Sequence, residues 1–508
     1  MELLLAIDAG TTSVKAGLFA PDGRCLGVGR QEYQLETPAA DRVQIDPEVY
    51  WQACLKTVRE AIRQSGVTHA QVKALAVSSQ GETTITLDAK GKVIYPALVW
   101  LDNRASDQAA ILAEKFGKDV YSRTGIPEIV PTWSACKILW IRQNEPEIFS
   151  RAHKFLLVQD YLIYRLTGRI VTDGSVSCTT LNYDLVKKTW WTDIQDAIGI
   201  RTDQLPEIVR PGTNVGTLSP EAAGQLGLST KACVVTGGMD QAVGAIGAGN
   251  FKTGMVSEST GAALAIQATI TDPMIDQSKV VPVYEHSVPD QYLFVPVCPT
   301  AGMAFKWFRD SFFQDEMKKA DDETMDAYDR LTQLAQPVPA GSDGLIMLPH
   351  LMGAFSPEPN LSARGSFTGF TLHHTRGHFV RALLEGVAFL LKRNLDYIER
   401  TGMVIPEIRS TGGGARSRLW NQIKANVCNR PIVTLANEET ALLGDAILAG
   451  VASGVFQSIE EGCYSMVVVR ESIQPDGDAL AYKEPYRLYC ELDQRLSDYF
   501  KHSYSKNT

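Results

Sequence analysis

The sequence contains no Cys-x-x-Cys pair among its nine cysteines. An odd number of isolated cysteines disfavours a disulfide framework, and it also disfavours a zinc site built from paired thiolates. We therefore expect nine free thiols in the reducing environment of the cytoplasm. These residues are Cys25, Cys54, Cys136, Cys178, Cys233, Cys298, Cys428, Cys463 and Cys490.

An excess of positive charge is also missing. The chain has 49 lysine and arginine residues against 58 aspartate and glutamate residues, which gives a formal net charge of -9. A nucleic-acid-binding surface needs a basic patch, and the sequence contains no block of like charges. The composition therefore predicts a protein without a nucleic-acid partner.

Long apolar runs are absent as well. The first apolar run has no basic segment before it and is interrupted by Asp8, so we do not interpret it as a signal peptide. The run Ala441–Phe456 contains Asp445 and is too short to cross a bilayer. These features predict a cytoplasmic protein that does not enter a membrane.

Two common glycine-rich nucleotide motifs do not occur. The sequence lacks the Walker A pattern G-x-x-x-x-G-K-[ST], and no G-x-G-x-x-G follows a strand in a Rossmann context. The P-loop and dinucleotide-binding classes are therefore disfavoured.

The pattern of strands and helices indicates an α/β fold with more than one domain. A chain of 508 residues exceeds the roughly 300 residues of one core. Leu3–Ile7 and Val14–Phe19 predict a hairpin, and Asp46–Gly66 predicts a capped helix before the strand "VKALAVSS". The strand–turn–strand pattern returns in "GMVSESTGAALAIQA", which suggests an internal duplication with a boundary near Gly247–Gly254.

The turn of the first hairpin, in "IDAGTTSVKAGLF", has the composition of an anion site. Backbone N–H groups around Gly10–Thr12 can point at one spot, and the hydroxyls add donors suited to phosphate. Asp8 beside a phosphate needs a cation between them, and Mg²⁺ prefers such oxygen ligands. A plain hairpin with a polar turn is the alternative.

A second candidate is Asp240 in "CVVTGGMDQAVGAIGAG". A buried strand runs through Gly237–Gly238 to Asp240 at the start of a helix of small residues. Aspartate is a common N-cap, which is the structural interpretation. The functional interpretation is a general base, which phosphoryl transfer uses to orient a hydroxyl and accept its proton.

A third candidate is the turn in "STGGGARSRLW", where Gly412–Gly414 join a strand to a helix. Glycines at such a junction allow a nucleotide to approach closely, although a tight connection explains them equally well.

His374 and His378 are four residues apart, a spacing that metal ligands on a helix use. Gly377 lies between them at an expected helix start, and no third ligand is evident. We therefore do not predict a metal site there.

The motifs in this order resemble those of the FGGY carbohydrate kinases, within the actin, hexokinase and chaperone ATPase superfamily. The resemblance extends from Leu3 to about Tyr486. "SACKILWIRQN" resembles one family signature, and "GSFTGFTLHHTRGHFVRALLEG" resembles the other with departures at Phe370 and Leu383. "DAGTTSVK" and "STGAA" resemble the two phosphate motifs, "GGMDQAVGAIG" the catalytic segment and "GGGARSRLW" the adenosine motif.

The resemblance implies an α/β protein with two ribonuclease-H-like domains flanking a catalytic cleft. It implies a sugar-binding or polyol-binding N-terminal domain at 1–248 and an ATP-binding C-terminal domain at 249–486. A C-terminal helix and tail would occupy 487–508. ATP and Mg²⁺ are the implied cofactors.

The resemblance also implies the site residues. Asp240 is the expected catalytic base, and Asp8 and Asp240 are the expected metal ligands. The expected ATP-binding residues are Gly10, Thr11, Thr12, Ser13, Lys15, Thr260, Gly261, Gly413, Gly414, Ala415 and Ser417. The expected substrate-binding residues are Gln80, Gly81, Glu82, Asp102, Arg104, Asp240 and Gln241.

The substrate is ambiguous at the segment "SSQGETT". Glycerol kinases resemble this chain at Glu82 but carry arginine where it has Gly81, and xylulokinases carry Met-His at these two positions. We expect the loss of arginine at Gly81 to open space, so that a substrate larger than glycerol binds Glu82. A salt bridge between Glu82 and Arg104 is the alternative.

The leading hypothesis is therefore an ATP-dependent, xylulokinase-like pentulose kinase. The alternatives are a glycerol- or erythritol-type polyol kinase, an autoinducer kinase, and a non-catalytic sugar-binding regulator. The expected partner is a small sugar or polyol, and a homodimer is a further expectation.

Overall fold

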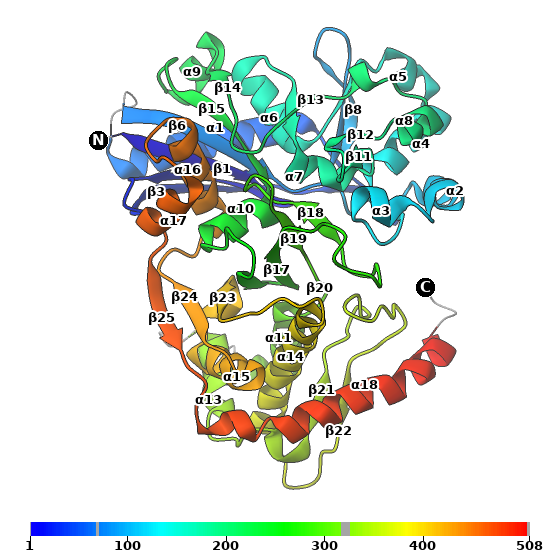
Figure 1. The fold of residues 1–508 in the computed structure, drawn as a ribbon, viewed down its shortest axis with the longest axis vertical. Helices are drawn as coiled ribbons and strands as arrows, with labels where there is room; N and C mark the ends of the chain where they lie inside the picture. Colours follow the sequence, from blue (N-terminus) through cyan, green and yellow to red (C-terminus); the bar gives the residue numbers. More distant parts are fainter. Residues whose placement is uncertain (1, 68–70, 316–325, 505–508) are drawn as a thin grey trace. The chain divides into compact units, whose positions relative to one another are not determined.

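The protein is described by a computed structural model that covers residues 2–67, 71–315 and 326–504. It forms two compact units, whose elements are drawn in Figure 1. Unit 1 comprises Met1–Thr253, Thr269–Phe294 and Glu439–Val468, and unit 2 comprises Gly254–Ala268, Val295–Glu438 and Val469–Thr508.

Two stretches from the second half of the sequence, Thr269–Phe294 and Glu439–Val468, thus pack with the N-terminal residues in unit 1. The boundaries 1–248, 249–486 and 487–508, with the functions attached to them, stay predictions, as does a cleft between domains. Residues 505–508 of the expected tail lie outside the described part of the chain.

The elements of unit 1 are β1 (Leu3–Ala9), β2 (Ser13–Phe19), β3 (Cys25–Glu32), β4 (Glu36–Ala39), β5 (Arg42–Ile45), α1 (Pro47–Ser65), β6 (Val72–Ser79), β7 (Thr84–Leu87), β8 (Val93–Leu98), α2 (Ser106–Phe116), α3 (Val120–Thr124), α4 (Ser134–Asn144), α5 (Pro146–Arg151), β9 (Lys154–Leu156), α6 (Val158–Thr167), β10 (Val171–Asp173), α7 (Gly174–Ser177), η2 (Cys178–Thr180), β11 (Tyr183–Asp184), β12 (Thr189–Trp190), α8 (Thr192–Ile198), η3 (Thr202–Gln204), β13 (Glu207–Val209), β14 (Asn214–Thr217), α9 (Pro220–Leu226), β15 (Cys233–Met239), α10 (Asp240–Gly247), β18 (Val283–Glu285), β19 (Tyr292–Phe294), α16 (Thr440–Ala452) and α17 (Ile459–Met466).

The main sheet of unit 1 has the strand order β14-β15-β6-β1-β2-β3. β1, β2 and β3 form an antiparallel meander, whereas β6 and β15 run parallel to β1. This is the ribonuclease-H-like arrangement that the resemblance implies. It brings the carboxyl ends of β1, β6 and β15 to one edge of the sheet, where parallel strands commonly place ligands.

Both faces of this sheet are buried, which explains why β1 is apolar at nearly every position. Leu3, Leu5 and Ile7 belong to a core that includes the buried side chains of α1. Leu4 points to the opposite face, where Gly450 of α16 approaches its side chain. Side chains alternate along a strand, so β1 contributes to two cores at once.

A second sheet of unit 1, with the order β4-β5-β8-β7-β9, flanks a separate core built around α2, α4 and α8. The segment that links β6 to β7 carries Gln80, Gly81 and Glu82. The two sheets therefore hold this expected substrate-binding segment at both of its ends.

The elements of unit 2 are β16 (Val256–Thr260), most of β17 (Leu264–Ile270), β20 (Val297–Cys298), α11 (Gly302–Phe312), α13 (Ala327–Ala335), η4 (Ser342–Gly344), β21 (Ile346–Leu348), β22 (Ser366–Thr368), α14 (Arg376–Glu399), β23 (Ile408–Thr411), η5 (Gly413–Arg416), α15 (Arg418–Cys428), β24 (Ile432–Leu435), β25 (Val469–Ile473), η6 (Gly477–Leu480) and α18 (Lys483–Tyr504).

Unit 2 repeats the strand order of unit 1. β20, β17 and β16 pair antiparallel, and β23 and β24 follow parallel to β16, with β25 antiparallel at the edge. The corresponding strands of unit 1 are β3, β2, β1, β6 and β15. The shared order supports the internal duplication inferred from the two hairpins.

Local signals in the sequence predicted these elements well. The two hairpins and the strand–turn–helix of "STGGGARSRLW" are confirmed. In α1, Asp46 caps the N-terminus by accepting the N–H of Glu48, and Gly66 ends the helix at φ 65°.

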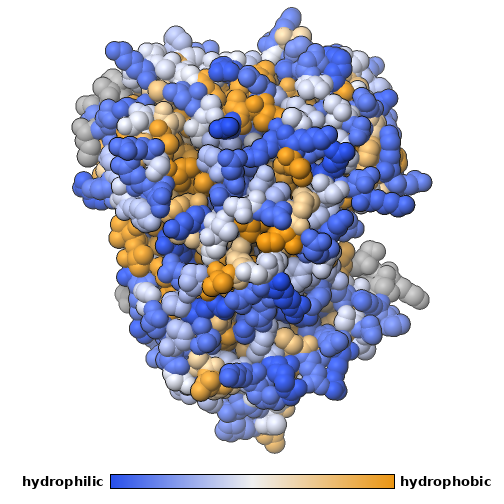
Figure 2. All heavy atoms as spheres, viewed as in Figure 1, coloured by the Kyte–Doolittle hydropathy of each residue, from blue (hydrophilic) through white to orange (hydrophobic). Residues whose placement is uncertain are grey.

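The predictions about thiols and membrane segments can be compared with the described residues. All nine cysteines are free thiols, as expected. No helix in the described ranges is long and apolar enough to cross a membrane. The face seen in Figure 2 is largely hydrophilic, with apolar side chains in scattered groups.

Glycines allow α10 and α16 to cross at very short distance. A Cβ at Gly247 of α10 would lie 1.8 Å from the carbonyl oxygen of Thr440, and a Cβ at Gly444 of α16 would lie 1.9 Å from that of Val243. The crossing matters for function, because α10 begins with Asp240 and α16 carries Asp445.

We expect Gly247→Ala to lower the free energy of unfolding by about 1–3 kcal/mol, because an added methyl group has no space at the crossing. The matched control is Gly244→Ala in the same helix, where the nearest atom to a Cβ is 3.8 Å away. Urea denaturation followed by circular dichroism measures both variants. Equal stability of the two variants would contradict the close crossing.

Candidate active site

Asp8 lies near the end of β1, opposite Lys15 across the hairpin. Burial raises the pKa of the Asp8 carboxyl to about 6, although the Lys15 charge and a hydrogen bond from Ser78 act in the opposite direction. Lys15 Nζ also donates to Glu439 Oε2. Ionisation of Asp8 is therefore less favourable in the folded protein than in water, and a cation bound beside it would offset this cost.

The turn between β1 and β2 is held in place by its neighbours. The Gly10 N–H donates to Ser13 O over 3.0 Å, and Trp100 Nε1 donates to Thr11 Oγ1 over 2.8 Å. Because the Gly10 N–H is committed to the turn, Thr11 and Thr12 are left to supply N–H donors. Thr12 is exposed, so its hydroxyl is accessible.

Asp240 is the first residue of α10, and Met239 occupies the N-cap position. The structural interpretation of Asp240 as an N-cap is therefore wrong. Asp240 Oδ1 accepts the N–H of the adjacent Gln241 over 2.6 Å. Burial, with a smaller contribution from the nearby charge of Asp8, raises the pKa of Asp240 to about 7. A carboxyl with this pKa can accept a proton near neutral pH.

Glu82 faces the same group of charges. Burial raises the pKa of Glu82 to about 8, with Lys137 opposing the shift and Asp240 adding to it. Burial lowers the pKa of Lys137 to about 7, against the effect of the Glu82 charge. Asp8, Glu82 and Asp240 thus form one electrostatic cluster in unit 1, assembled from the three strand ends or the segments that follow them.

The backbone of Glu82 is fixed in a left-handed conformation with φ 57°. Its N–H donates to Thr179 Oγ1 over 3.0 Å, and its carbonyl accepts from Ser134 Oγ and Lys137 Nζ over 3.2 and 3.1 Å. Such a conformation costs free energy for a non-glycine residue and persists where surrounding contacts over-determine it. These contacts fix the backbone from which the Glu82 side chain extends.

The expectation that Gly81 opens space in the pocket is wrong. A Cβ at Gly81 would lie 2.6 Å from the side chain of Thr179. Thr179 fills the volume that the missing side chain leaves. The sequence could not reveal this contact, because Thr179 is far from Gly81 along the chain.

Asp102 and Arg104 form a buried ion pair at 2.8 Å. Asp102 also accepts the N–H of Val43, and Arg104 donates to Gln44 and stacks over the ring of Trp140 at 5.0 Å. Arg104 thus pairs with Asp102, and the alternative salt bridge between Glu82 and Arg104 is not formed. The charged groups of Asp102 and Arg104 already pair with each other. A substrate-binding role for these two residues stays a prediction.

The two remaining substrate-binding predictions lie close to this cluster in sequence. Gln80 is buried, and its Nε2 donates to Tyr50 Oη while its Oε1 has no partner. Gln241 follows Asp240 in α10. The roles of both residues stay predictions.

The expected nucleotide residues of unit 2 gather where β16 and β23 end. A Cβ at Gly414 would lie 2.6 Å from Thr260 Cγ2, so the two turns touch. Thr260 Oγ1 donates to Glu258 Oε2 over 2.6 Å and points into the core. Ser417 caps α15 by accepting the N–H of Trp420. A hollow beside these turns is lined by Ser410, Thr411, Gly412, Ala415, Arg416, Thr434, Leu435, Asn437, Glu438 and Arg470.

Sequence reasoning missed the partners behind Asp8. Ser78 Oγ lies 3.2 Å from Asp8 Oδ1 and 2.6 Å from Asp445 Oδ2. Burial raises the pKa of Asp445 well above its usual range, although the hydrogen bond that Ser78 Oγ donates to Asp445 Oδ2 acts in the opposite direction. The only signal in the sequence was an aspartate inside the apolar run Ala441–Phe456. Sequence reasoning also missed Tyr284. Burial raises the pKa of its phenol, and the charges of Glu82 and Asp240 add to the shift.

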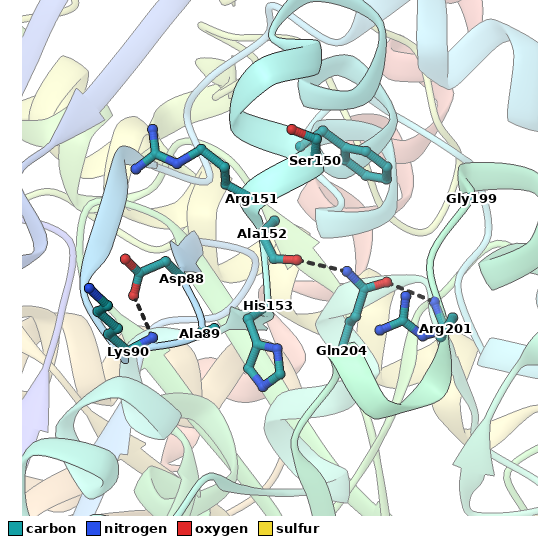
Figure 3. A pocket seen from close by; sticks show the side chains of 11 residues that line it. Asp88, Ala89, Lys90, Ser150, Arg151, Ala152, His153, Gly199, Arg201 and Gln204 are labelled. Carbon is teal, nitrogen blue, oxygen red and sulfur yellow. Dashed lines mark hydrogen bonds between the residues drawn. The ribbon is translucent and has the colours of Figure 1, made fainter.

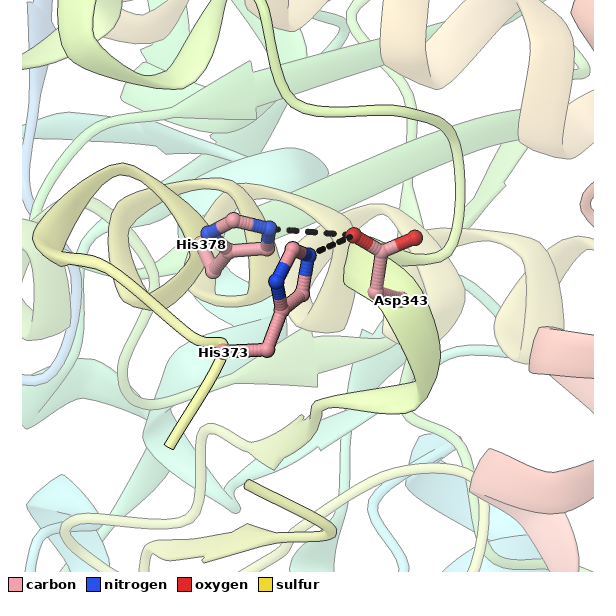
Figure 4. A group of neighbouring side chains, drawn as sticks. All are labelled: Asp343, His373 and His378. Atoms are coloured by element: carbon pink, nitrogen blue, oxygen red, sulfur yellow. Dashed lines mark hydrogen bonds and ion pairs between the residues drawn. The ribbon is translucent and has the colours of Figure 1, made fainter. Parts of the chain in front are cut away.

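His373, His378 and Asp343 lie together at the start of α14 (Figure 4). His378 Nε2 lies 3.1 Å from Asp343 Oδ2, while its Nδ1 accepts the N–H of Thr375 over 3.1 Å. That bond places the proton on Nε2, the atom that would have to bind a metal. His378 is therefore part of the capping box of α14, a role that the sequence analysis did not predict.

The largest hollow of unit 1 among those described does not coincide with the candidate active site. It is lined by basic side chains that include Lys90, Arg151, His153 and Arg201, and by none of the predicted site residues (Figure 3). Gln204 at its floor donates to Ala152 O and accepts the N–H of Arg201, so its polar atoms are satisfied. We assign this hollow no role.

Comparison with known proteins defines the class first. Residues 3–247 match the N-terminal domain, and residues 259–453 the C-terminal domain, of the FGGY family of carbohydrate kinases. The protein is thus a carbohydrate kinase by class, a phosphotransferase with a sugar acceptor. The chain belongs to the FGGY family.

Two relatives and two crystal structures show how similar this chain is to members of the family. The xylulose kinase of Bacillus subtilis (strain 168) is 31% identical over 98% of this chain and 98% of the relative, and the gluconokinase of that strain is 32% identical over 90% and 89%. Crystal structures of xylulose kinase and gluconate kinase from Lactobacillus acidophilus superpose with TM-scores of 0.90 and 0.89, each at 27% identity over 100% of both chains.

We expect Asp240→Asn to stabilise the folded protein at alkaline pH. The folded pKa of Asp240 is about 7 against an ordinary 3.8, so stability is highest below about pH 4 and is lost as pH rises through 7. Asparagine carries no charge, so its advantage should reach about 1–4 kcal/mol at pH 8 and shrink towards pH 4.

Thermal unfolding at pH 8 and pH 4.5 without divalent cations tests this expectation. The control is Asp196→Asn on the exposed face of α8, which should change nothing. An Asp240→Asn variant less stable than wild type at pH 8 would show that the carboxyl is not the strained group inferred here.

Proposed function

We propose that the protein transfers the γ-phosphoryl group of ATP to a hydroxyl of a small ketose, as a xylulokinase-like pentulose kinase. The observation that carries the proposal is Asp240, a buried carboxyl with a pKa of about 7 at the start of α10, in a chain of the FGGY family. A base of this pKa can orient the attacking hydroxyl and accept its proton.

Mg²⁺ fits the residues around this base. Asp8 and Asp240 both resist ionisation, and the Asp8 charge raises the pKa of Asp240. Carboxylate oxygens are the ligands that Mg²⁺ prefers, so these two would hold it. When bound, the ion supplies charge neutralisation for the transferring phosphoryl group. Ser78 and Asp445 orient Asp8 from behind.

Glu82 is the group that we assign to acceptor recognition. Its backbone is fixed by Thr179, Ser134 and Lys137, while its carboxylate makes no hydrogen bond within the described residues. Burial raises the pKa of Glu82 to about 8, so its carboxyl can hold a proton near neutral pH. The ionised carboxylate accepts hydrogen bonds and the protonated carboxyl can also donate one, so a substrate hydroxyl is a suitable partner for either form.

ATP is the second substrate of the proposal. We assign the turn at Thr11–Thr12 to phosphate contacts and the hollow beside Gly412–Gly414 to adenosine, because glycine permits close approach of a ligand. We also propose a cytoplasmic location, on the basis of the nine free thiols, and a homodimer, which sedimentation would test.

Gluconate is the second candidate acceptor, and the 32% identity to a gluconokinase is the observation that favours it. A coupled assay of ADP release over D-xylulose, L-ribulose, gluconate, erythritol and glycerol decides between these acceptors. The proposal predicts the highest kcat/KM with a pentulose. A protein that binds sugars but releases no ADP would instead be a non-catalytic regulator.

We expect Asp240→Asn to lower kcat by about 10²–10⁴-fold, because the base is lost. In wild type, kcat/KM should fall on the acid side with an apparent pKa near 7, because the proton held by Asp240 must leave first. The Asp196→Asn control should keep both the rate and the profile. Turnover of Asp240→Asn within a few-fold of wild type would exclude the assignment.

We expect Glu82→Gln to lower kcat/KM for the best acceptor by roughly 10- to 100-fold, because the amide replaces one carboxyl oxygen with a nitrogen and cannot reproduce all of its hydrogen bonds to the acceptor. KM for ATP should change little. Glu128→Gln, at an exposed position, is the control. Unchanged acceptor kinetics in Glu82→Gln, or glycerol as the best acceptor of wild type, would rule out this assignment of the pocket.

A further inference from the structure

An ion pair lies entirely within the core of unit 2. Lys424 Nζ of α15 lies 2.7 Å from Glu258 Oε1 of β16, and both side chains are 0% exposed. Two charges removed from water are expensive unless all their hydrogen-bonding capacity is used. A hydrophobic pair of similar volume would stabilise the fold equally well. Stability alone therefore does not account for the buried ion pair.

The pair ties together the two strand ends that precede the glycine turns. Glu258 Oε2 accepts from Thr260 Oγ1 over 2.6 Å, and Glu258 Oε1 also accepts from Ser410 Oγ. The Glu258 carbonyl accepts from Thr411 Oγ1 over 3.0 Å. One residue thus receives hydrogen bonds from the ends of both β16 and β23.

Lys424 adds α15 to this arrangement. Its ammonium donates to Thr260 Oγ1 over 2.9 Å as well as to Glu258. One turn earlier in the same helix, Asn421 Nδ2 donates to the carbonyl oxygen of Ala415 in η5 over 2.7 Å. The helix therefore holds the turn after β16 through Lys424 and the turn after β23 through Asn421.

The two turns also touch directly. A Cβ at Gly412 would lie 2.9 Å from Thr260 O, and a Cβ at Gly414 would lie 2.6 Å from Thr260 Cγ2. Because a close-packed contact transmits displacement, a shift of Thr260 moves the glycine turn with it.

We propose that the buried Glu258–Lys424 pair is a positioning device for ATP: it fixes the Thr260–Gly261 turn against the Gly412–Gly414 turn without touching the nucleotide. The inference rests on the proposed function, in which these turns bind ATP. It gives Thr260 a different role from the one its motif implies. The Thr260 hydroxyl serves the pair by donating its proton to Glu258, and the backbone of the turn faces the nucleotide.

The first test is Lys424→Met. Loss of the ammonium frees Thr260 and leaves a carboxylate without its counter-charge, so kcat/KM for ATP should fall at least tenfold. KM for the acceptor should change less than twofold, since the acceptor residues lie in unit 1. Lys392→Met is the matched control, because it breaks an ion pair with Asp396 in the same unit that contacts neither turn.

The second test separates positioning from stability. The double variant Glu258→Gln with Lys424→Met removes both charges. Its amide oxygen can accept from one of the Thr260 and Ser410 hydroxyls, and its amide nitrogen can donate to the oxygen of the other. We expect its melting temperature to recover relative to Lys424→Met, whereas the tenfold loss for ATP persists. The double variant also carries the test if the single variant does not fold. Recovery of ATP kinetics together with melting temperature would overturn the proposal, because the pair would then be only structural.

Titration of the acceptor-free protein with ADP by calorimetry completes the test. Wild type should bind ADP at least tenfold more tightly than the double variant. Equal affinity of the two proteins would overturn the positioning role alone. If the wild-type protein binds no ADP, both the proposed function and this inference are wrong.

Discussion

The burial of three carboxyl groups away from water is the constraint on which the rest of unit 1 depends. Asp8, Glu82 and Asp240 each have a raised pKa, and burial is the largest cause for all three. An arrangement of this kind is unfavourable in the isolated fold and must be held by the surrounding structure. A divalent cation and a substrate hydroxyl are the partners that would relieve it.

The helices and strands around the cluster supply that support. The parallel strands β1, β6 and β15 bring Asp8, Ser78 and the residues before Asp240 to one edge of the sheet. The close crossing of α10 and α16 places Asp445 behind Ser78. Glycine is required at the crossing, because any side chain there would push the two helices apart. Asp240 on α10 and Asp445 on α16 would then both be displaced.

The two units share a strand order and differ in the chemistry at the strand ends. In unit 1 the strand ends, or the segments that follow them, carry Asp8, Glu82 and Asp240, buried acids with raised pKa values. In unit 2 the corresponding ends carry Glu258 fully paired with Lys424. A buried ion pair fixes the positions of both side chains, whereas a buried carboxyl without such a partner can still exchange a proton. The proposed roles, proton transfer in unit 1 and positioning of a nucleotide in unit 2, are consistent with this difference.

The sequence by itself determined the local elements and the family. Asp46 and Gly66 bounded α1, glycine and hydroxyl residues marked both hairpin turns, and the order of the motifs identified an FGGY kinase. These features depend on neighbours within a few residues. Only the tertiary structure decided that Thr179 fills the space beside Gly81, that Arg104 pairs with Asp102, and that Thr260 turns towards Lys424. Ser78 and Asp445 are 367 residues apart and Glu258 and Lys424 are 166 apart, and burial and pairing at such separations arise only when the chain has folded.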